Sequence, residues 1–230
     1  MAAKSGRWKR LLIKIAVAAG LLCVLGFLFM RSVRDSVATP YTIHSSKMRN
    51  WKLAINADAG PNDPILMLQP PPELTQDLFG QVFKRVMESM ETSSSPAIPL
   101  VLKREFDQAF AGRVTPETLL ATAQAAGLDA NAFQPKCLAH RRVSDPRATQ
   151  QIYFVLFDAP AYVTFREQIG TLVDAAPGAA GNFDPGSLSP LLFIAVSESL
   201  FSRWLPLRAD PKADCVAPVV IDSTAAGQQL

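Results

Sequence analysis

The longest apolar stretch of the chain lies near its N-terminus, at Leu11–Met30. It holds a single charged residue, Lys14, close to its first edge. An α-helix rises about 1.5 Å per residue, so a segment of this length spans roughly 30 Å, the thickness of the hydrocarbon layer of a bilayer. The segment has no polar face, as a helix surrounded by lipid requires. The pattern predicts one transmembrane helix over residues 11–30.

Charge around this segment predicts its orientation. Four basic residues precede it and two follow it, one of them offset by Asp35; they are Lys4, Arg7, Lys9 and Arg10 before, and Arg31 and Arg34 after. The positive-inside rule therefore places residues 1–10 in the cytoplasm and the rest of the chain on the other side. A cleaved signal peptide is the main alternative, with small residues at Ser36–Ala38. The charged stretch at Met30–Arg34 favours an uncleaved signal anchor.

The pattern after the anchor is that of a globular domain. Residues 31–50 hold Pro40 and several hydroxyl side chains without an apolar period, which predicts a stalk. Trp51–Asn56 alternates apolar and smaller residues, and Ile65–Leu68 is apolar after a turn-rich stretch, which together predict a β-hairpin. After Pro70–Pro72, Leu74, Leu78 and Val82 recur every four residues and predict a helix that covers a sheet.

The next elements continue the alternation of strands and helices. Ile98–Leu102 is apolar throughout and predicts a strand buried on both faces. Short helices are expected at 104–110 and after the N-cap Thr115, the second one closed by Gly127. The remaining expectations are strands at 136–143, 152–157, 191–196 and 216–221, helices from Pro160 and over 198–205, and a disordered tail at 223–230.

These elements predict an α/β or α+β fold, a mixed sheet of about seven strands with helices packed on it. The domain extends over residues 51–222. Its two parts, 51–127 and 133–222, show the same order of elements, which raises the possibility of two pseudo-repeated ββαβ halves. Coincidence is the alternative, because chains of this class alternate such elements in any case.

Composition indicates the kind of partner and the cellular compartment that suit this chain. The net charge is +3, and much of the excess lies around the anchor, which argues against a nucleic-acid partner. Abundant alanine and proline are typical of a GC-rich bacterial genome, so the membrane is expected to be a bacterial inner membrane and the domain periplasmic.

In the periplasm Cys137 and Cys215 predict a disulfide, worth about 3–4 kcal/mol in the chain-entropy model. Two free thiols are the alternative if the orientation is reversed, and Cys23 is a small apolar residue of the anchor.

Candidate chemistry is sparse. His44 lies in the expected stalk, and the one polar cluster that suggests binding is His140, Arg141 and Arg142. In a strand, His140 and Arg142 face one side and Arg141 the other, and arginines so close together can hold an anionic group. A solvent-exposed hairpin face is the alternative. Paired carboxylates, Asp58 with Asp63 and Glu105 with Asp107, are weaker candidates.

The sequence favours a non-catalytic domain that binds a partner protein or an envelope component, and the anchor Leu11–Met30 makes the lipid bilayer a partner as well. It predicts no catalytic residue, no metal ligand and no cofactor, and it leaves the oligomeric state open. Two alternatives remain. One is a membrane-tethered hydrolase using His140 or paired carboxylates, and the other is a sensor domain that binds a small ligand between two lobes.

Overall fold

A computed structural model gives the structure of the protein. It describes residues 14, 16–28, 39–92, 96–145, 148–175, 183–197 and 208–222. The chain divides into two compact units, Met1–Thr39 and Pro40–Leu230.

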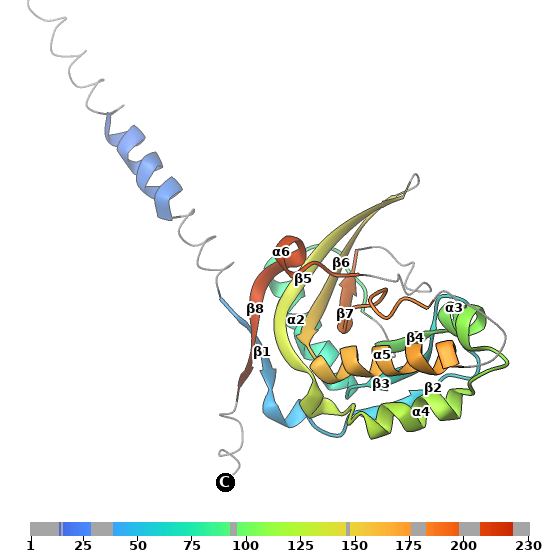
Figure 1. Ribbon diagram of the computed structural model, residues 1–230. Helices are drawn as coiled ribbons and strands as arrows, with labels where there is room; N and C mark the ends of the chain where they lie inside the picture. The colour runs from blue at the N-terminus through green and yellow to red at the C-terminus, as the bar shows by residue number, and fades with distance from the viewer. Residues whose placement is uncertain are drawn as a thin grey trace, which may run out of the picture. The chain divides into compact units, whose positions relative to one another are not determined.

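The described part of the N-terminal unit is helical. Residue 14 and residues 16–28 adopt helical geometry (Figure 1). Every one of these residues is exposed. Among the described residues, no helix is both long enough and apolar enough to cross a membrane. Some residues of the expected anchor lie outside the described residues, namely 11–13, 15, 29 and 30. Residues 1–10 lie outside them as well.

The second unit contains two β-sheets. The larger sheet has five strands in the order β1-β8-β5-β6-β7, and the smaller one has three in the order β2-β3-β4. The strands are β1 (Tyr41–His44), β2 (Lys52–Ile55), β3 (Pro64–Gln69), β4 (Ile98–Leu102), β5 (Gln134–Asp145), β6 (Ala148–Asp158), β7 (Leu191–Val196) and β8 (Cys215–Asp222). Among the described strands, only β1 and β8 pair in parallel, so the predicted mixed α/β character is confirmed while the expected single sheet is replaced by two.

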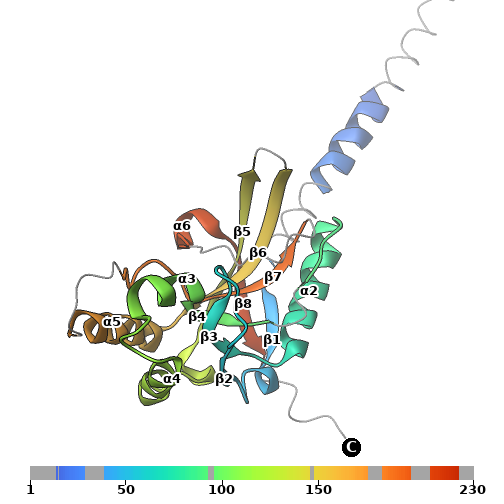
Figure 2. The ribbon, with the colours of Figure 1, turned by 90° about the vertical axis from the view of Figure 1, so that its right-hand side faces the viewer.

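Helices pack against both sheets. They are α2 (Pro72–Val86), α3 (Lys103–Glu105), α4 (Pro116–Ala125), α5 (Pro160–Ala175) and α6 (Pro211–Asp214), with short turns η1 (Ser45–Lys47), η2 (Phe106–Phe110) and η3 (Ala130–Ala132). Helix α2 contacts β1 and β7, while α4 contacts β2, β3 and α5. Figure 2 shows α2 at one side of the domain and α4 and α5 at the other.

One hydrophobic core joins the two sheets. The spacing that predicts α2 is confirmed, because Leu74, Leu78 and Val82 are all buried in this core. Strand β4 is buried along its whole length, as its uniformly apolar sequence predicts. Burying a leucine side chain contributes about 1.5–3 kcal/mol, so this stripe supplies much of the attachment of α2 to the sheet.

The two halves of the domain have the same connectivity. In each half, an antiparallel hairpin is followed by a helix that begins at a proline, and then by a strand antiparallel to the second hairpin strand. The helices also cross between halves: α2 contacts β7, and Tyr162 and Arg166 of α5 donate hydrogen bonds to the β4 carbonyls of Pro99 and Leu100. The halves therefore interlock.

The N-terminal boundary of the domain differs from the expected one. The sequence predicts a stalk up to residue 50, but the structure places Tyr41 and Ile43 in the core as part of β1. Gln81 of α2 holds this strand: its Nε2 donates to the Thr42 carbonyl oxygen at 2.8 Å, and its Oε1 accepts from the Thr42 N–H at 2.9 Å. Four residues are too few to reveal a strand by alternation, so β1 is recognised only through its partners.

Replacing Gln81 with alanine should loosen β1. The change removes the partner of the Thr42 N–H and of the Thr42 carbonyl oxygen on the side of α2. The loss should lower the unfolding free energy by about 1–2 kcal/mol. Urea denaturation of the full chain in detergent measures the loss. Gln76→Ala, an exposed change on the same helix, is the matched control. Equal midpoints for the two variants would contradict the role given to Gln81.

Candidate functional site

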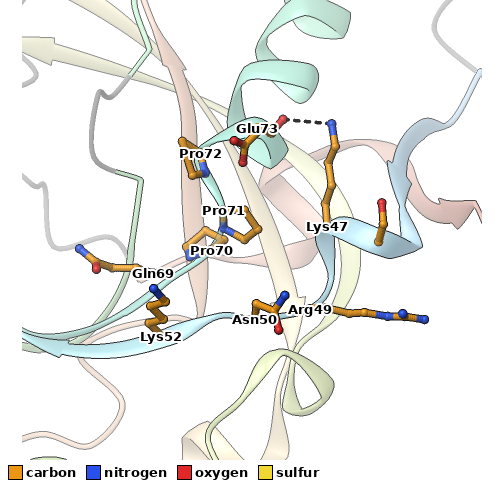
Figure 3. A pocket seen from close by; sticks show the side chains of 10 residues that line it. Lys47, Arg49, Asn50, Lys52, Gln69, Pro70, Pro71, Pro72 and Glu73 are labelled. Atoms are coloured by element: carbon orange, nitrogen blue, oxygen red, sulfur yellow. Dashed lines mark hydrogen bonds between the residues drawn. The ribbon is translucent and has the colours of Figure 1, made fainter.

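An open cleft of about 530 Å³ lies at the N-terminal end of α2. Its lining comes from the turn after β1, the start of β2 and the link between β3 and α2; the residues are Ser46, Lys47, Arg49, Asn50, Lys52, Gln69, Pro70, Pro71, Pro72 and Glu73. Figure 3 shows Lys47 reaching toward Glu73 on one side of this α2 cleft, and Lys52 beside Gln69 on the other. Three consecutive prolines form its apolar floor.

Trp51 positions the basic wall of the cleft. Its indole Nε1 donates to the Lys47 carbonyl oxygen at 2.9 Å, and its ring packs against Phe133 and Phe157 with centroids 5.9 and 5.8 Å away. Asn50 just before it has φ of 61°, the left-handed conformation that asparagine tolerates better than most residues. The chain therefore turns sharply at Asn50, and the flanking basic side chains face outward.

The cleft carries more positive than negative charge. Lys47 forms an ion pair with Asp77 and lies 3.5 Å from the Glu73 carbonyl oxygen, whereas Arg49 and Lys52 are exposed. Glu73 is the one carboxylate of the lining. Helix α2 begins here without a side-chain cap, so its N-terminal dipole adds to the positive potential. Such a surface attracts anionic groups.

A second cleft occupies the equivalent place in the other half of the domain. It also measures about 530 Å³ and lies where β6 passes into α5. Its lining includes Lys136 near the start of β5, Asp158 at the end of β6, and Pro160 and Val163 of α5. Val163, one of the apolar residues of this α5 cleft, keeps 52% of its surface exposed. Each ββαβ half thus presents a lysine beside the start of its helix.

The predicted cluster His140–Arg142 is divided between the two faces of β5. His140 is half-buried, its ring stacks on Tyr153 with centroids 4.6 Å apart, and its Nε2 lies 3.1 Å from Gln151 Oε1. Gln151 in turn donates to Glu88 at 2.8 Å. Burial raises the pKa of Tyr153, with Glu88 and Tyr41 adding to the rise and Arg142 opposing it. His140 therefore belongs to a cross-strand polar chain, with the exposed Arg142 nearby.

Arg141 lies on the opposite face and is bound within the protein. It forms an ion pair with the buried Asp214, its Nε donating to Asp214 Oδ1 at 3.0 Å, and it also donates to the Arg208 carbonyl oxygen. Burial alone would raise the pKa of Asp214, but hydrogen bonds from Arg141 and from the Asp210 N–H, together with the charge of Arg141, lower it. These contacts attach α6 to β5 and leave Arg141 little capacity for an external anion.

The predicted disulfide is confirmed. Cys137 of β5 and Cys215 of β8 are bonded, with Cα atoms 5.7 Å apart. The bond lies close to the Arg141–Asp214 ion pair, so a covalent and an electrostatic link both tie β5 to the chain around the start of β8. Cys23 is the free cysteine of the described residues and is exposed.

The buried side chain of Arg166 has many hydrogen-bond partners, and the sequence did not predict it as a candidate residue. Arg166 of α5 has no exposed surface, and its Nη2 and Nη1 donate to Glu105 at 2.8 and 3.0 Å. It also donates to Ser187 Oγ and to the carbonyl oxygens of Leu100, Asp184 and Pro185. Burial alone would raise the pKa of Glu105, but its hydrogen bonds from Arg166, Ser187 and the Leu102 N–H, with the Arg166 charge, lower it.

The predicted carboxylate pairs serve local structure. Asp63 accepts from the Gly60 N–H at 3.0 Å within a turn, and Asp107 pairs with Lys103 one helical turn away. Glu105 turns inward to Arg166 instead. The one sequence signal for that contact is an arginine within an amphipathic helix, which is far too common to identify a buried pair.

Comparison with known proteins gives no match. No family model fits the chain, and no curated protein and no solved structure resembles it significantly.

Replacing Glu105 with glutamine should destabilise the domain in a pH-dependent way. It leaves the buried Arg166 charge without its counter-ion, which typically costs about 3–5 kcal/mol. Because the pKa of Glu105 is lower in the folded state than the usual value of about 4.3, the pair stabilises fully above that value and is lost as the pH falls through the folded-state pKa. Urea denaturation at pH 7 and at lower pH should therefore show a difference that shrinks on acidification.

The exposed Glu117→Gln change on α4 is the control for this measurement. A difference between Glu105→Gln and the unmodified chain that stays constant with pH would contradict an ionic role for Glu105.

Proposed function

We propose that the protein is a single-pass membrane protein whose domain lies outside the cytoplasm and binds a partner protein or an envelope component. The observation that carries this proposal is the Cys137–Cys215 disulfide. Disulfides persist in exported compartments and are rare in the reducing cytosol. The bond joins β5 to β8, the last strand, so it closes most of the second half of the domain.

The N-terminal unit supports the membrane anchor. Residues 16–28 form an uncharged, apolar helix without a polar side, and large side chains such as Leu22 and Phe27 are 71% and 67% exposed. A helix that is apolar on all sides needs an apolar environment. Lipid supplies it, and the basic residues before the segment favour a cytoplasmic N-terminus.

The α2 cleft is the surface that we assign to binding. It is open, three prolines are part of its lining, and Arg49 and Lys52 are exposed, whereas Lys47 is paired with Asp77 and Glu73 is the one carboxylate of the lining. An open cleft of this charge suits an acidic segment of a partner or an anionic envelope polymer, because complementary charges speed association and set the orientation of the partner.

The contacts of the candidate catalytic groups support the hydrolase alternative less well. The hydrogen-bonding partner of His140 is the amide of Gln151, and Glu88 reaches His140 only through that amide. A general base is more effective when a carboxylate orients it directly. Glu105, whose pKa is lowered by its partners, is a weak base. A small-ligand sensor would favour an enclosed site, whereas the α2 cleft is open.

The membrane orientation can be tested with reporter fusions in bacterial cells. Alkaline phosphatase joined after Leu230 should be active, because the enzyme matures only outside the cytoplasm. A fusion joined after Arg10, before the apolar segment, is the control and should stay inactive. The same cells should yield a full chain whose mobility changes with reductant, unlike a Cys137→Ser variant. An inactive C-terminal fusion would refute the exported location.

The role of the α2 cleft can be tested by reversing its exposed charges. A double variant, Arg49→Glu with Lys52→Glu, should retain about five- to thirty-fold less of the proteins that co-purify with the detergent-solubilised chain, since two surface charges contribute about 1–2 kcal/mol together. The control is Arg104→Glu with Lys212→Glu, which makes the same change in net charge elsewhere on the domain. Equal recovery from both variants would exclude this cleft as the binding surface.

A further inference from the structure

An apolar face remains exposed at the C-terminal end of α2. Phe83 and Met87 are 47% and 83% exposed, and they lie one helical turn apart, on the same side of the chain. Phe83 stacks on the half-buried Phe79, with ring centroids 6.1 Å apart, so the aromatic ring is held in place. Met87 follows the last helical residue in a left-handed conformation that projects it from the helix end.

This end of α2 lies beside the point where the N-terminal segment joins the domain. Arg85, between the two apolar residues, donates from Nη2 to the Pro40 carbonyl oxygen at 3.1 Å. Its guanidinium also lies 3.9 Å over the ring of Tyr41. Pro40 is the first residue of the second unit. The start of the second unit at Pro40 and Tyr41 is therefore held by a residue of the same helical turns that expose Phe83 and Met87.

The length of the connecting chain limits which part of the domain can reach a membrane. Nine residues separate Met30 from Pro40, and even a fully extended chain of that length spans only about 30 Å. A domain of this size is about 40 Å across. Surfaces near Pro40 can therefore touch the bilayer with little extension of this connection, whereas α4, which Figures 1 and 2 place well away from β1, could do so only if the connection were largely extended.

Charge near the apolar face is compatible with a lipid surface. Lys84, which follows Phe83 in the sequence, is exposed. The nearby Glu88 is exposed, but it accepts a hydrogen bond from Gln151 on the side of β6. Aromatic and sulfur-bearing side chains next to a lysine are a common combination where a helix touches the boundary between headgroups and acyl chains.

We propose that Phe83, Met87 and Lys84 contact the outer surface of the bilayer that holds the anchor. This contact rests on the proposed function, because it requires the anchor in the membrane. It keeps the C-terminal end of α2 at the lipid surface. The α2 cleft lies at the opposite end of the same helix, about 20 Å away along 15 residues, and so faces away from the lipid.

Quenching by spin-labelled lipids tests the contact in the full chain. The chain is placed in lipid nanodiscs that hold one copy each, with a fluorophore at Met87→Cys in a Cys23→Ser background. The label at position 87 should be quenched at least about three times as strongly as one at Ala121→Cys, an exposed control position on α4. Adding Phe83→Ser should weaken the quenching at 87 without changing it at 121.

A label on the native Cys23 tests the membrane anchor separately from the lipid contact of α2. If Cys23 is quenched while positions 87 and 121 are equally unquenched, the anchor stands and the lipid contact of α2 is refuted. If Cys23 is not quenched, the anchor is refuted and the α2 contact falls with it. If position 87 becomes protected only in discs holding two copies, its face is a dimer interface and the lipid contact is again refuted.

Discussion

A fully buried guanidinium holds the two halves of this domain together. Arg166 comes from the helix of the second half, yet its strongest partner, Glu105, follows the last strand of the first half. A charge without solvent must be matched by a counter-ion and by hydrogen bonds, or its desolvation destabilises the fold. The carbonyl oxygen of Leu100 and the segment around Ser187 complete the set. Strand β4, α3, α5 and residues 184–187 must therefore be in place together.

The edge strand β1 of the large sheet and its neighbour β8 are secured by different means. Strand β1 runs parallel to β8 and is held from α2 by Gln81 and Arg85. Strand β8 is tied to β5 by the Cys137–Cys215 disulfide, with Arg141 and Asp214 alongside. Because β1 is also where the N-terminal segment joins, the proposed membrane attachment acts on a strand whose backbone is already engaged on both sides.

Much of the fold could be predicted because its signals are local. The four-residue period of Leu74, Leu78 and Val82 identified α2, and Thr115 was correctly expected to cap α4, where its hydroxyl accepts from the Thr118 N–H. The division into two sheets could not be predicted, since the order of elements does not state which strands pair. Strand alternation placed Arg141 on the opposite face from His140, but its ion pair with Asp214 could not be predicted. The α2 cleft could not be predicted either, because it combines residues from three separate segments.

By itself the sequence determined the apolar N-terminal segment and the order of most strands and helices, and it favoured the disulfide between the two cysteines of the domain. These follow from composition, period and the small number of cysteines. Only the tertiary structure decided that β1 belongs to the domain, that Arg166 meets Glu105 across 61 residues, and that Lys47, Lys52 and Glu73 share a cleft. Such contacts depend on how separate elements pack, and side-chain chemistry alone leaves many equivalent partners for each charge.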